Sequence, residues 1–162
     1  MILRNEDLQP FFSPYLQGGY KRDVLLLSVA ELTPPYIDAR LDVAQCFTPA
    51  DGEFHLTVPL AFIWIAQLGI IYGCLDNGLS TKEGEVYLRK IELTCKQPIK
   101  KTRDIFFHLE ITGKKKVPNG VFYRGNIDIE HQSFVGFASF VLPLESHSPE
   151  NQRNGRDQVQ RS

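Results

Sequence analysis

The sequence has little of the features that define several classes of protein. Its 18 lysine and arginine residues nearly balance 19 acidic residues, giving a formal net charge of −1, whereas a nucleic-acid-binding protein carries a basic excess or stripe. Cys46, Cys74 and Cys95 are too few and too far apart for a disulfide framework or a zinc knuckle. The four histidines do not have metal-ligand spacing. We therefore expect no nucleic-acid partner, no bound metal and no cofactor.

What remains is an ordinary soluble composition of 162 residues, of which 43% are hydrophobic and 23% are charged. A chain of this length buries a sizeable core as one domain without a disulfide or a metal. The amino terminus, MILRNEDLQPFF, has charges where a signal peptide needs an apolar run. We therefore expect a cytoplasmic protein with reduced thiols.

One uncharged stretch, Val58 to Leu75, is nearly long enough to cross a bilayer. It contains Pro59, Gln67 and two glycines, and no cluster of lysine or arginine flanks it as a topology signal. A core helix is therefore predicted over 58–77, and not a membrane span. Thr57 is its candidate N-cap, and Pro59 suits its first turn. Because the stretch is apolar on nearly every face, we expect other structure to wrap it.

Turn signals divide the rest of the chain into extended runs. Strand-like runs occur at 24–32, 36–46, 85–97, 103–112, 121–130 and 133–144. The run at 36–46 alternates apolar and polar residues, which is typical of a half-buried strand. A short helix is expected over 5–17, with Asn5 as its N-cap. Residues 145–162 have no large apolar side chain except Val159, which predicts a disordered polar tail.

The order of these elements predicts a single α+β domain over 1–144, in which an antiparallel sheet has its helix on one face. One long apolar helix against a strongly curved antiparallel sheet suggests the hotdog fold. The sheet of one chain covers only part of such a helix. We therefore expect a homodimer or a higher homo-oligomer, in which two sheets join at their edges and two helices pack side by side.

The loop and helix from Asp51 to Gly69, DGEFHLTVPLAFIWIAQLG, resemble the signature of the β-hydroxyacyl-ACP dehydratases. The positions that keep this frame are Gly52, Phe54, Ala66, Gln67 and Gly69. The histidine of that signature falls on Glu53 here, and its acidic helix residue falls near Ile63. The segment 87–100, YLRKIELTCKQPIK, is similar to a strand of the same family that ends in a basic residue and a proline.

A closer resemblance is to the FcoT-like long-chain acyl thioesterases, over about residues 11–144. The matching motifs, in the order of that family, are Ser13-Pro14-Tyr15, Gly52-Glu53-Phe54, Gln67-Leu68 and Leu88-Arg89-Lys90. The resemblance implies a hydrolase of acyl-CoA or acyl carrier protein thioesters in fatty-acid, polyketide or lipopeptide metabolism. Some members are assigned the addition of glycine across an enoyl-ACP double bond in isonitrile lipopeptide assembly, so that reaction stays open.

Thioester hydrolysis needs an activated water and a donor to the developing oxyanion. Backbone amides at the helix start, near Val58–Leu60, are candidate donors. Glu53, just before the helix, is a candidate general base, and its alternative is a solvated loop carboxylate. His55 is a second candidate for proton transfer near neutral pH, and its alternative is a structural hydrogen bond or plain exposure.

Two further polar residues are catalytic candidates. Gln67 lies in the middle of the apolar helix, and a buried amide has to be hydrogen-bonded. It therefore orients a water or the thioester carbonyl, or it ties the helix to the sheet. Tyr15 is a candidate donor to the thioester oxygen, and its alternative is packing beside Phe12 and Pro14.

Candidate substrate-binding residues are of two kinds. Those expected to line an apolar acyl tunnel are Phe54, Phe62, Trp64 and Leu68. Lysines and arginines are expected to concentrate positive charge at two sheet-end turns. This charge would bind the phosphates of CoA or of an acyl carrier protein. These cations are Lys96, Lys100, Lys101, Arg103 and Lys114 to Lys116. Solvated turns are the alternative interpretation.

Other functions remain open beside thioester hydrolysis. With the dehydratase positions replaced, the chain also fits an acyl-binding accessory protein that catalyses no reaction. A dehydratase or isomerase with relocated groups, such as His55 with Glu53, is the third hypothesis. Double-bond formation or migration without thiol release would distinguish it from a hydrolase.

Overall fold

The computed structural model describes residues 24–46, 51–80, 82 and 86–144. Within them, one antiparallel sheet has the strand order β1-β2-β4-β5-β6-β3, and the helix α3 connects β2 to β3. The elements are β1 (Val24–Thr33), β2 (Tyr36–Gln45), α3 (Val58–Asp76), β3 (Tyr87–Cys95), β4 (Ile105–Val117), β5 (Gly120–Ile129) and β6 (Phe134–Pro143). The helix predicted over 5–17, the candidate Tyr15 and the predicted tail lie outside the described residues.

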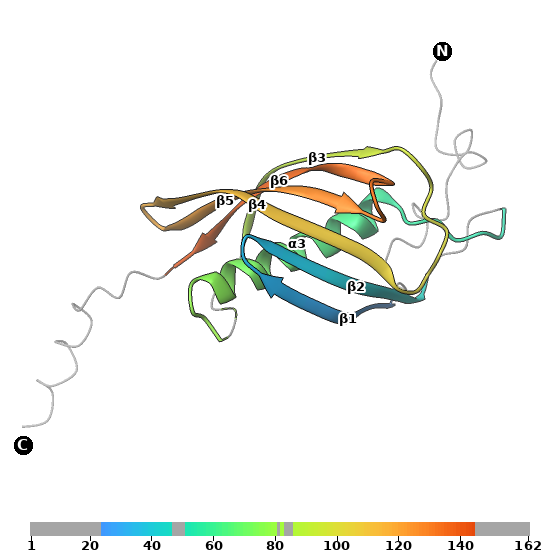
Figure 1. Ribbon diagram of the computed structural model, residues 1–162, viewed down its shortest axis with the longest axis horizontal. Helices are drawn as coiled ribbons and strands as arrows, with labels where there is room; N and C mark the ends of the chain where they lie inside the picture. The colour runs from blue at the N-terminus through green and yellow to red at the C-terminus, as the bar shows by residue number, and fades with distance from the viewer. Residues whose placement is uncertain (1–23, 47–50, 81, 83–85, 145–162) are drawn as a thin grey trace, which may run out of the picture.

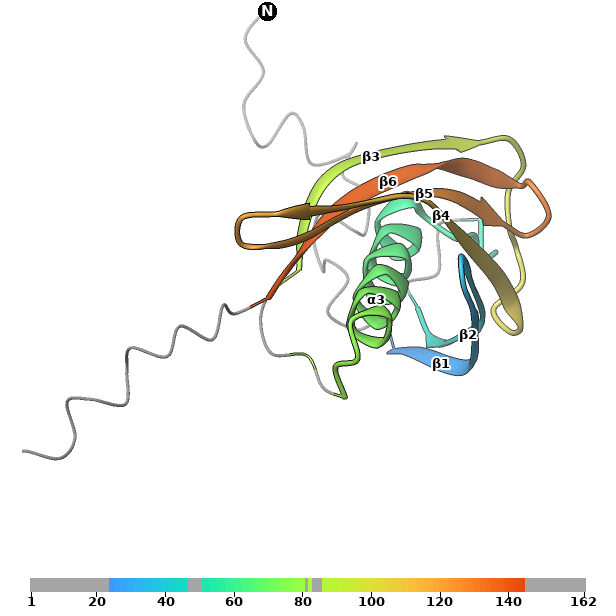
Figure 2. The ribbon, with the colours of Figure 1, turned by 60° about the vertical axis from the view of Figure 1, so that its left-hand side comes forward.

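The sheet curves around α3, so that the helix lies along its concave face (Figures 1 and 2). Alternation places one side of each strand toward the helix. In β2 the buried residues are Ile37, Ala39, Leu41 and Val43, which confirms the pattern predicted over 36–46. Strands β4, β5 and β6 contribute the aromatic part of the same core, including Phe107, Tyr123 and Phe140.

The helix begins after Thr57 with Pro59 in its first turn, and Asn77 is its C-cap. Its sheet-facing side chains include Leu60, Trp64, Leu68 and Tyr72. Gly69 permits close approach to the sheet, because a β-carbon there would lie 3.1 Å from the ring of Phe140. By length and composition α3 is also long and apolar enough to span a membrane, and half of that stretch is buried, as in a core helix.

Among the described residues, the sheet of the single chain covers only part of α3, as the sequence predicted. Val58, Phe62, Ile63 and Leu75 are 37–50% exposed, and Gln67 between them is exposed as well. A sheet covers only one side of a helix, so an apolar helix on one sheet leaves apolar side chains of its other side exposed to solvent. The expectation of a buried Gln67 amide is wrong for the single chain.

The β4–β5 hairpin is longer than the sequence predicted. The expected strand end at residue 112 is wrong, because β4 continues to Val117 and only Pro118 and Asn119 separate it from β5. An irregularity between Ile111 and Gly113 lets the pairing continue past the glycine. The hairpin is therefore a ribbon that extends beyond the end of β2, and β6 stays paired with β5 along it as far as Gly120 (Figure 1).

A polar cluster joins this hairpin to the carboxyl end of α3. The Tyr123 hydroxyl donates to Asp76 Oδ2 at 2.5 Å and accepts from Asn77 Nδ2 at 2.6 Å. Lys114 Nζ lies 2.6 Å from the same Asp76 oxygen. Burial, together with the hydrogen bond to Asp76, raises the pKa of Tyr123. Burial acts to raise the pKa of Asp76, but hydrogen bonds from Lys114 and Tyr123 hold that pKa below its ordinary value.

This cluster predicts an acid-sensitive part of the stability. Because the pKa of Asp76 is lower in the folded state than in the unfolded state, its stabilisation is complete above the ordinary aspartate pKa of about 4. The stabilisation is lost as the pH falls through the lowered folded-state value. We expect the free energy of unfolding to fall less steeply on acidification in Asp76→Asn than in the wild type. Urea unfolding over a pH series measures this, and parallel curves would contradict it.

Candidate active site

An open groove of about 410 Å³ lies at the amino end of α3. Its lining residues are His55, Leu56, Thr57 and Val58 at the helix start, Cys95, Lys96, Gln97 and Pro98 after β3, and Phe134 of β6. The Leu56 amide donates to the Ile99 carbonyl at 2.8 Å, which holds the two walls together. Two predicted residues, His55 and Lys96, therefore lie on one surface although they are distant in sequence.

The start of α3 offers backbone donors to this groove. Thr57 makes no side-chain capping bond, and its buried Oγ1 has no partner within the described part of the chain. The Ala61 amide makes the first helical bond, to the Thr57 carbonyl at 3.0 Å. Pro59 has no N–H, so the free donors before the Ala61 amide are the amides of Val58 and Leu60. Of these two residues, Val58 lines the groove, at the positive end of the helix dipole.

His55 is half-buried and lines the groove beside these amides. Among the described residues, its imidazole has no hydrogen-bond partner, so its nitrogens are open to a water or a ligand. Cys95 faces the same groove, a position that the sequence did not single out. Burial raises the pKa of the Cys95 thiol, which favours the protonated form over a thiolate nucleophile.

Glu53 and Lys100 form an ion pair outside the groove lining. Both side chains are about 60% exposed, at 59% and 61%. The hydrogen bond from Lys100 to Glu53 raises the pKa of the lysine. Of the two predicted proton-transfer residues, only His55 therefore lines the groove.

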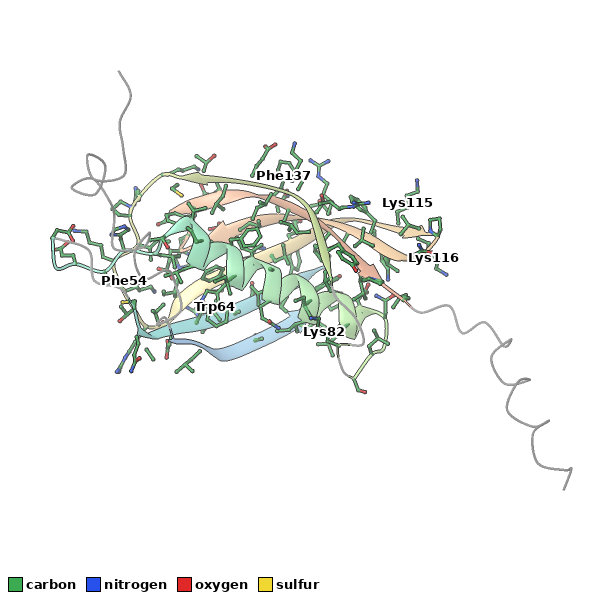
Figure 3. The ribbon with its side chains drawn as sticks, turned by 180° about the vertical axis from the view of Figure 1, so that it is seen from behind. Phe54, Trp64, Lys82, Lys115, Lys116 and Phe137 are labelled. Atoms are coloured by element: carbon green, nitrogen blue, oxygen red, sulfur yellow. The ribbon has the colours of Figure 1, made fainter. Side chains whose placement is uncertain are left out.

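The predicted tunnel residues lie in different places. Trp64 and Leu68 are buried against the sheet, and Phe62 is exposed on α3, as Gln67 is. Phe54 packs on the core at the amino end, where Figure 3 labels it. An apolar cavity of about 30 Å³ lies between α3, β3 and β6. It is lined by Ile65, Ala66, Gly69, Ile70, Val86, Leu88, Leu109, Ala138 and Phe140. None of the four predicted tunnel residues lines it.

The structure separates the basic residues into two groups. Lys96 and Lys100 lie at the amino end of α3, whereas Lys114 contacts Asp76 at the carboxyl end. A helix of 19 residues spans about 28 Å, so one phosphate group cannot contact both groups. Among the described residues, no group of three His, Cys, Asp or Glu side chains is placed to hold a metal ion.

A six-stranded antiparallel sheet curved around one long helix defines the class of this domain: it has a hotdog fold. Similar folds occur in thioesterase superfamily member 2 from zebra fish, at 12% identity over 73% of this chain and 80% of that one, with a TM-score of 0.48. Thioesterase HI1161 from Haemophilus influenzae is 16% identical over 91% and 96% of the two chains, with a TM-score of 0.47.

The dehydratase heterocomplex ApeI:P from Xenorhabdus doucetiae is also similar, at 13% identity over 78% of this chain and 83% of that one, with a TM-score of 0.44. At these identities the likeness concerns the fold alone. The sequence matches no family model and no curated protein. The resemblance to the FcoT-like thioesterases stays a prediction.

Proposed function

We propose that the protein hydrolyses acyl thioesters of CoA or of an acyl carrier protein. One observation carries the proposal: the groove at the amino end of α3 brings together His55, the uncapped Val58 amide and Lys96. An imidazole open to water, an N–H at the positive end of a helix and a nearby cation are the groups that this reaction requires.

In the proposed reaction, His55 accepts a proton from a water molecule whose oxygen attacks the thioester carbonyl carbon. The carbonyl oxygen becomes an oxyanion, and the Val58 amide donates to it. When the intermediate collapses, the C–S bond breaks and the imidazolium returns its proton to the leaving thiolate. The products are a carboxylic acid and a thiol. Lys96, with Lys100 beyond it, attracts the phosphates of the carrier.

We propose that the acyl chain lies beside Phe62, at one edge of the open face of α3, and that a second α3 covers the rest of that face. Ala66 and Ile70, which border that face, also line the apolar cavity. Gln67 stays a candidate for orienting a water or the thioester carbonyl, and Tyr15 stays a candidate donor to the thioester oxygen. Glu53 retains a role through its ion pair with Lys100, which holds the helix-entry loop against the segment after β3.

The open face of α3 also supports the proposal of a homodimer. Ile63 is 44% exposed in the middle of an apolar stripe, and a second α3 would cover it. We expect Ile63→Glu to yield a monomer in analytical ultracentrifugation, since pairing would bury a carboxylate without a partner. Gln132→Glu, in the exposed β5–β6 turn, adds the same charge and should leave the dimer intact. A monomeric wild type, or a dimeric Ile63→Glu, would contradict this expectation.

The test of the proposed function is the release of free thiol from short- to long-chain acyl-CoA and acyl-pantetheine thioesters, saturated and α,β-unsaturated. We expect release that depends on chain length. If no thiol is released from any substrate, hydrolysis is wrong. Mass spectrometry of the remaining thioesters then distinguishes a dehydratase, an isomerase or an amine-addition enzyme from a protein that only binds acyl groups.

A further inference from the structure

The two ends of α3 lie in different electrostatic surroundings. Near the amino end, most cations are paired with carboxylates. These ion pairs are Lys100–Glu53, Lys101–Glu130 at 2.9 Å and Arg40–Asp104 at 3.5 Å. At the carboxyl end, the hairpin from Thr112 to Arg124 contains four lysines and arginines and no acidic residue. The hairpin therefore carries positive charge that nothing on it neutralises, in a chain of net charge −1.

One of these cations fixes the hairpin and the others project from it. Lys114 pairs with Asp76 and lies 5.8 Å from the ring centroid of Tyr123. Lys115 and Lys116 are exposed and form no ion pair among the described residues. They pair in register with Phe122 and Val121, so they point to opposite faces of the ribbon. Figure 3 shows them at the far end of the hairpin, on different sides.

Apolar and basic side chains of neighbouring elements continue this surface. Tyr87 at the start of β3 is 59% exposed, and Leu75 at the end of α3 is 50% exposed. The register across β3, β6, β5 and β4 aligns Tyr87 with Val141, Phe122 and Lys115 in one row. Arg124 lies in the next row of the same face, 5.0 Å from the ring centroid of Phe137. Lys90 lies at the same distance from that ring, but it is paired with Glu92 at 2.5 Å. We call Leu75, Tyr87, Lys115, Lys116 and Arg124 the hairpin end.

We propose that the hairpin end rests on an anionic lipid surface. Cations on both faces of a ribbon reach the same partner only if that partner meets the tip end-on, as a plane of lipid phosphates does. An acidic protein or a nucleic acid lying along one face would pair with Lys115 or with Lys116, but not with both. Tyrosine and leucine side chains that flank a basic cluster favour the lipid headgroup region.

The uncharged tip agrees with an end-on approach. Val117 to Gly120 contains no carboxylate that the lipid phosphates would repel. The contacts of Asp76 with Lys114 and Tyr123 hold the ribbon on α3, so ordering it on the surface costs little conformational entropy. This contact is independent of the proposed hydrolysis, because the groove lies at the other end of α3.

Co-sedimentation with vesicles tests the proposal. One set of vesicles is phosphatidylcholine alone, and the other is an equimolar mixture of phosphatidylcholine and phosphatidylglycerol. We expect binding to the anionic vesicles only, weakened by salt. Near an anionic surface each lysine contributes about fivefold in partitioning, so Lys115→Gln/Lys116→Gln should reduce it about 25-fold. The matched double variant Lys96→Gln/Arg103→Gln, at the opposite end of the molecule, should bind like the wild type.

Several results would overturn the proposal. The wild type could fail to bind anionic vesicles, or it could bind neutral vesicles equally well. The two double variants could also lose vesicle binding to the same extent. Binding of a single-stranded RNA oligonucleotide that the hairpin variant loses, without vesicle binding, would assign the surface to nucleic acid instead. Thermal unfolding of each variant verifies that the fold is kept, and Tyr87→Ser tests the apolar contribution, since its binding should fall at all salt concentrations.

Discussion

His55→Asn is expected to lower the rate of thiol release about 10²- to 10⁴-fold, the range that a positioned general base contributes. His55 is the only histidine among the described residues of the groove, and asparagine keeps its approximate size and polarity. Binding of the thioester should change less than kcat, because Lys96 and the helix start remain. Stopped-flow or colorimetric detection of the thiol measures the difference.

The control for this experiment is His131→Asn. His131 lies in the β5–β6 turn with a φ of 51°, a conformation that asparagine tolerates, and stacks on Phe106 on the other side of the sheet from α3. It should release thiol at the wild-type rate. If His55→Asn is fully active while Glu53→Gln is inactive, the base is Glu53 and the helix-entry loop rearranges when substrate binds.

Tyr123→Ala is expected to destabilise the fold by roughly 3–5 kcal/mol, the range for removing a buried aromatic side chain. Tyr123 is fully buried and its ring stacks on Phe140 at a centroid distance of 5.2 Å, with Tyr72 edge-on at 5.9 Å. Tyr123→Phe keeps these contacts and removes only the hydroxyl. It should cost about 1–3 kcal/mol, because Asp76 and Asn77 lose a partner in a poorly solvated place.

Urea unfolding at equal protein concentration measures both values. Tyr87→Phe is the matched control, since Tyr87 is exposed and its change should remain within about 0.5 kcal/mol. If Tyr123→Phe is as stable as the wild type, the hydroxyl is not part of the link between α3 and the hairpin. The hairpin would then depend on Lys114 and Asp76 alone.

The sequence predicted the elements of this fold better than it predicted their surroundings. Period-two alternation in β2 and the Thr57-Pro59 helix start are local signals, and both agree with the structure. An almost uniformly apolar helix has no periodicity that distinguishes its covered face from its open face. The exposure of Gln67 was therefore not predictable, because the curvature of the sheet decides it.

The candidate site was predicted in part. The residues of the helix-entry loop are contiguous, so His55 and the Val58 amide could be proposed from sequence. The other wall of the groove depends on the long-range pairing of Leu56 with Ile99, which no local pattern contains. For the same reason Cys95 was not recognised from the sequence as a groove residue. The positions of the two lysine groups at opposite ends of α3 likewise follow from the topology of the sheet, which local sequence does not give.

The irregularity between Ile111 and Gly113 has a consequence for insertions and deletions. Before it, odd-numbered residues of β4 face α3; after it, even-numbered residues do, and Lys114 thereby lies beside Tyr123. Loss of Gly113 would remove the extra residue, so that Thr112 pairs with Arg124 and Lys114 keeps its place opposite Tyr123 and Asp76. Loss of Lys114 itself would bring Lys115 opposite Tyr123, so three consecutive lysines make this attachment tolerant of a one-residue deletion on either side of the irregularity.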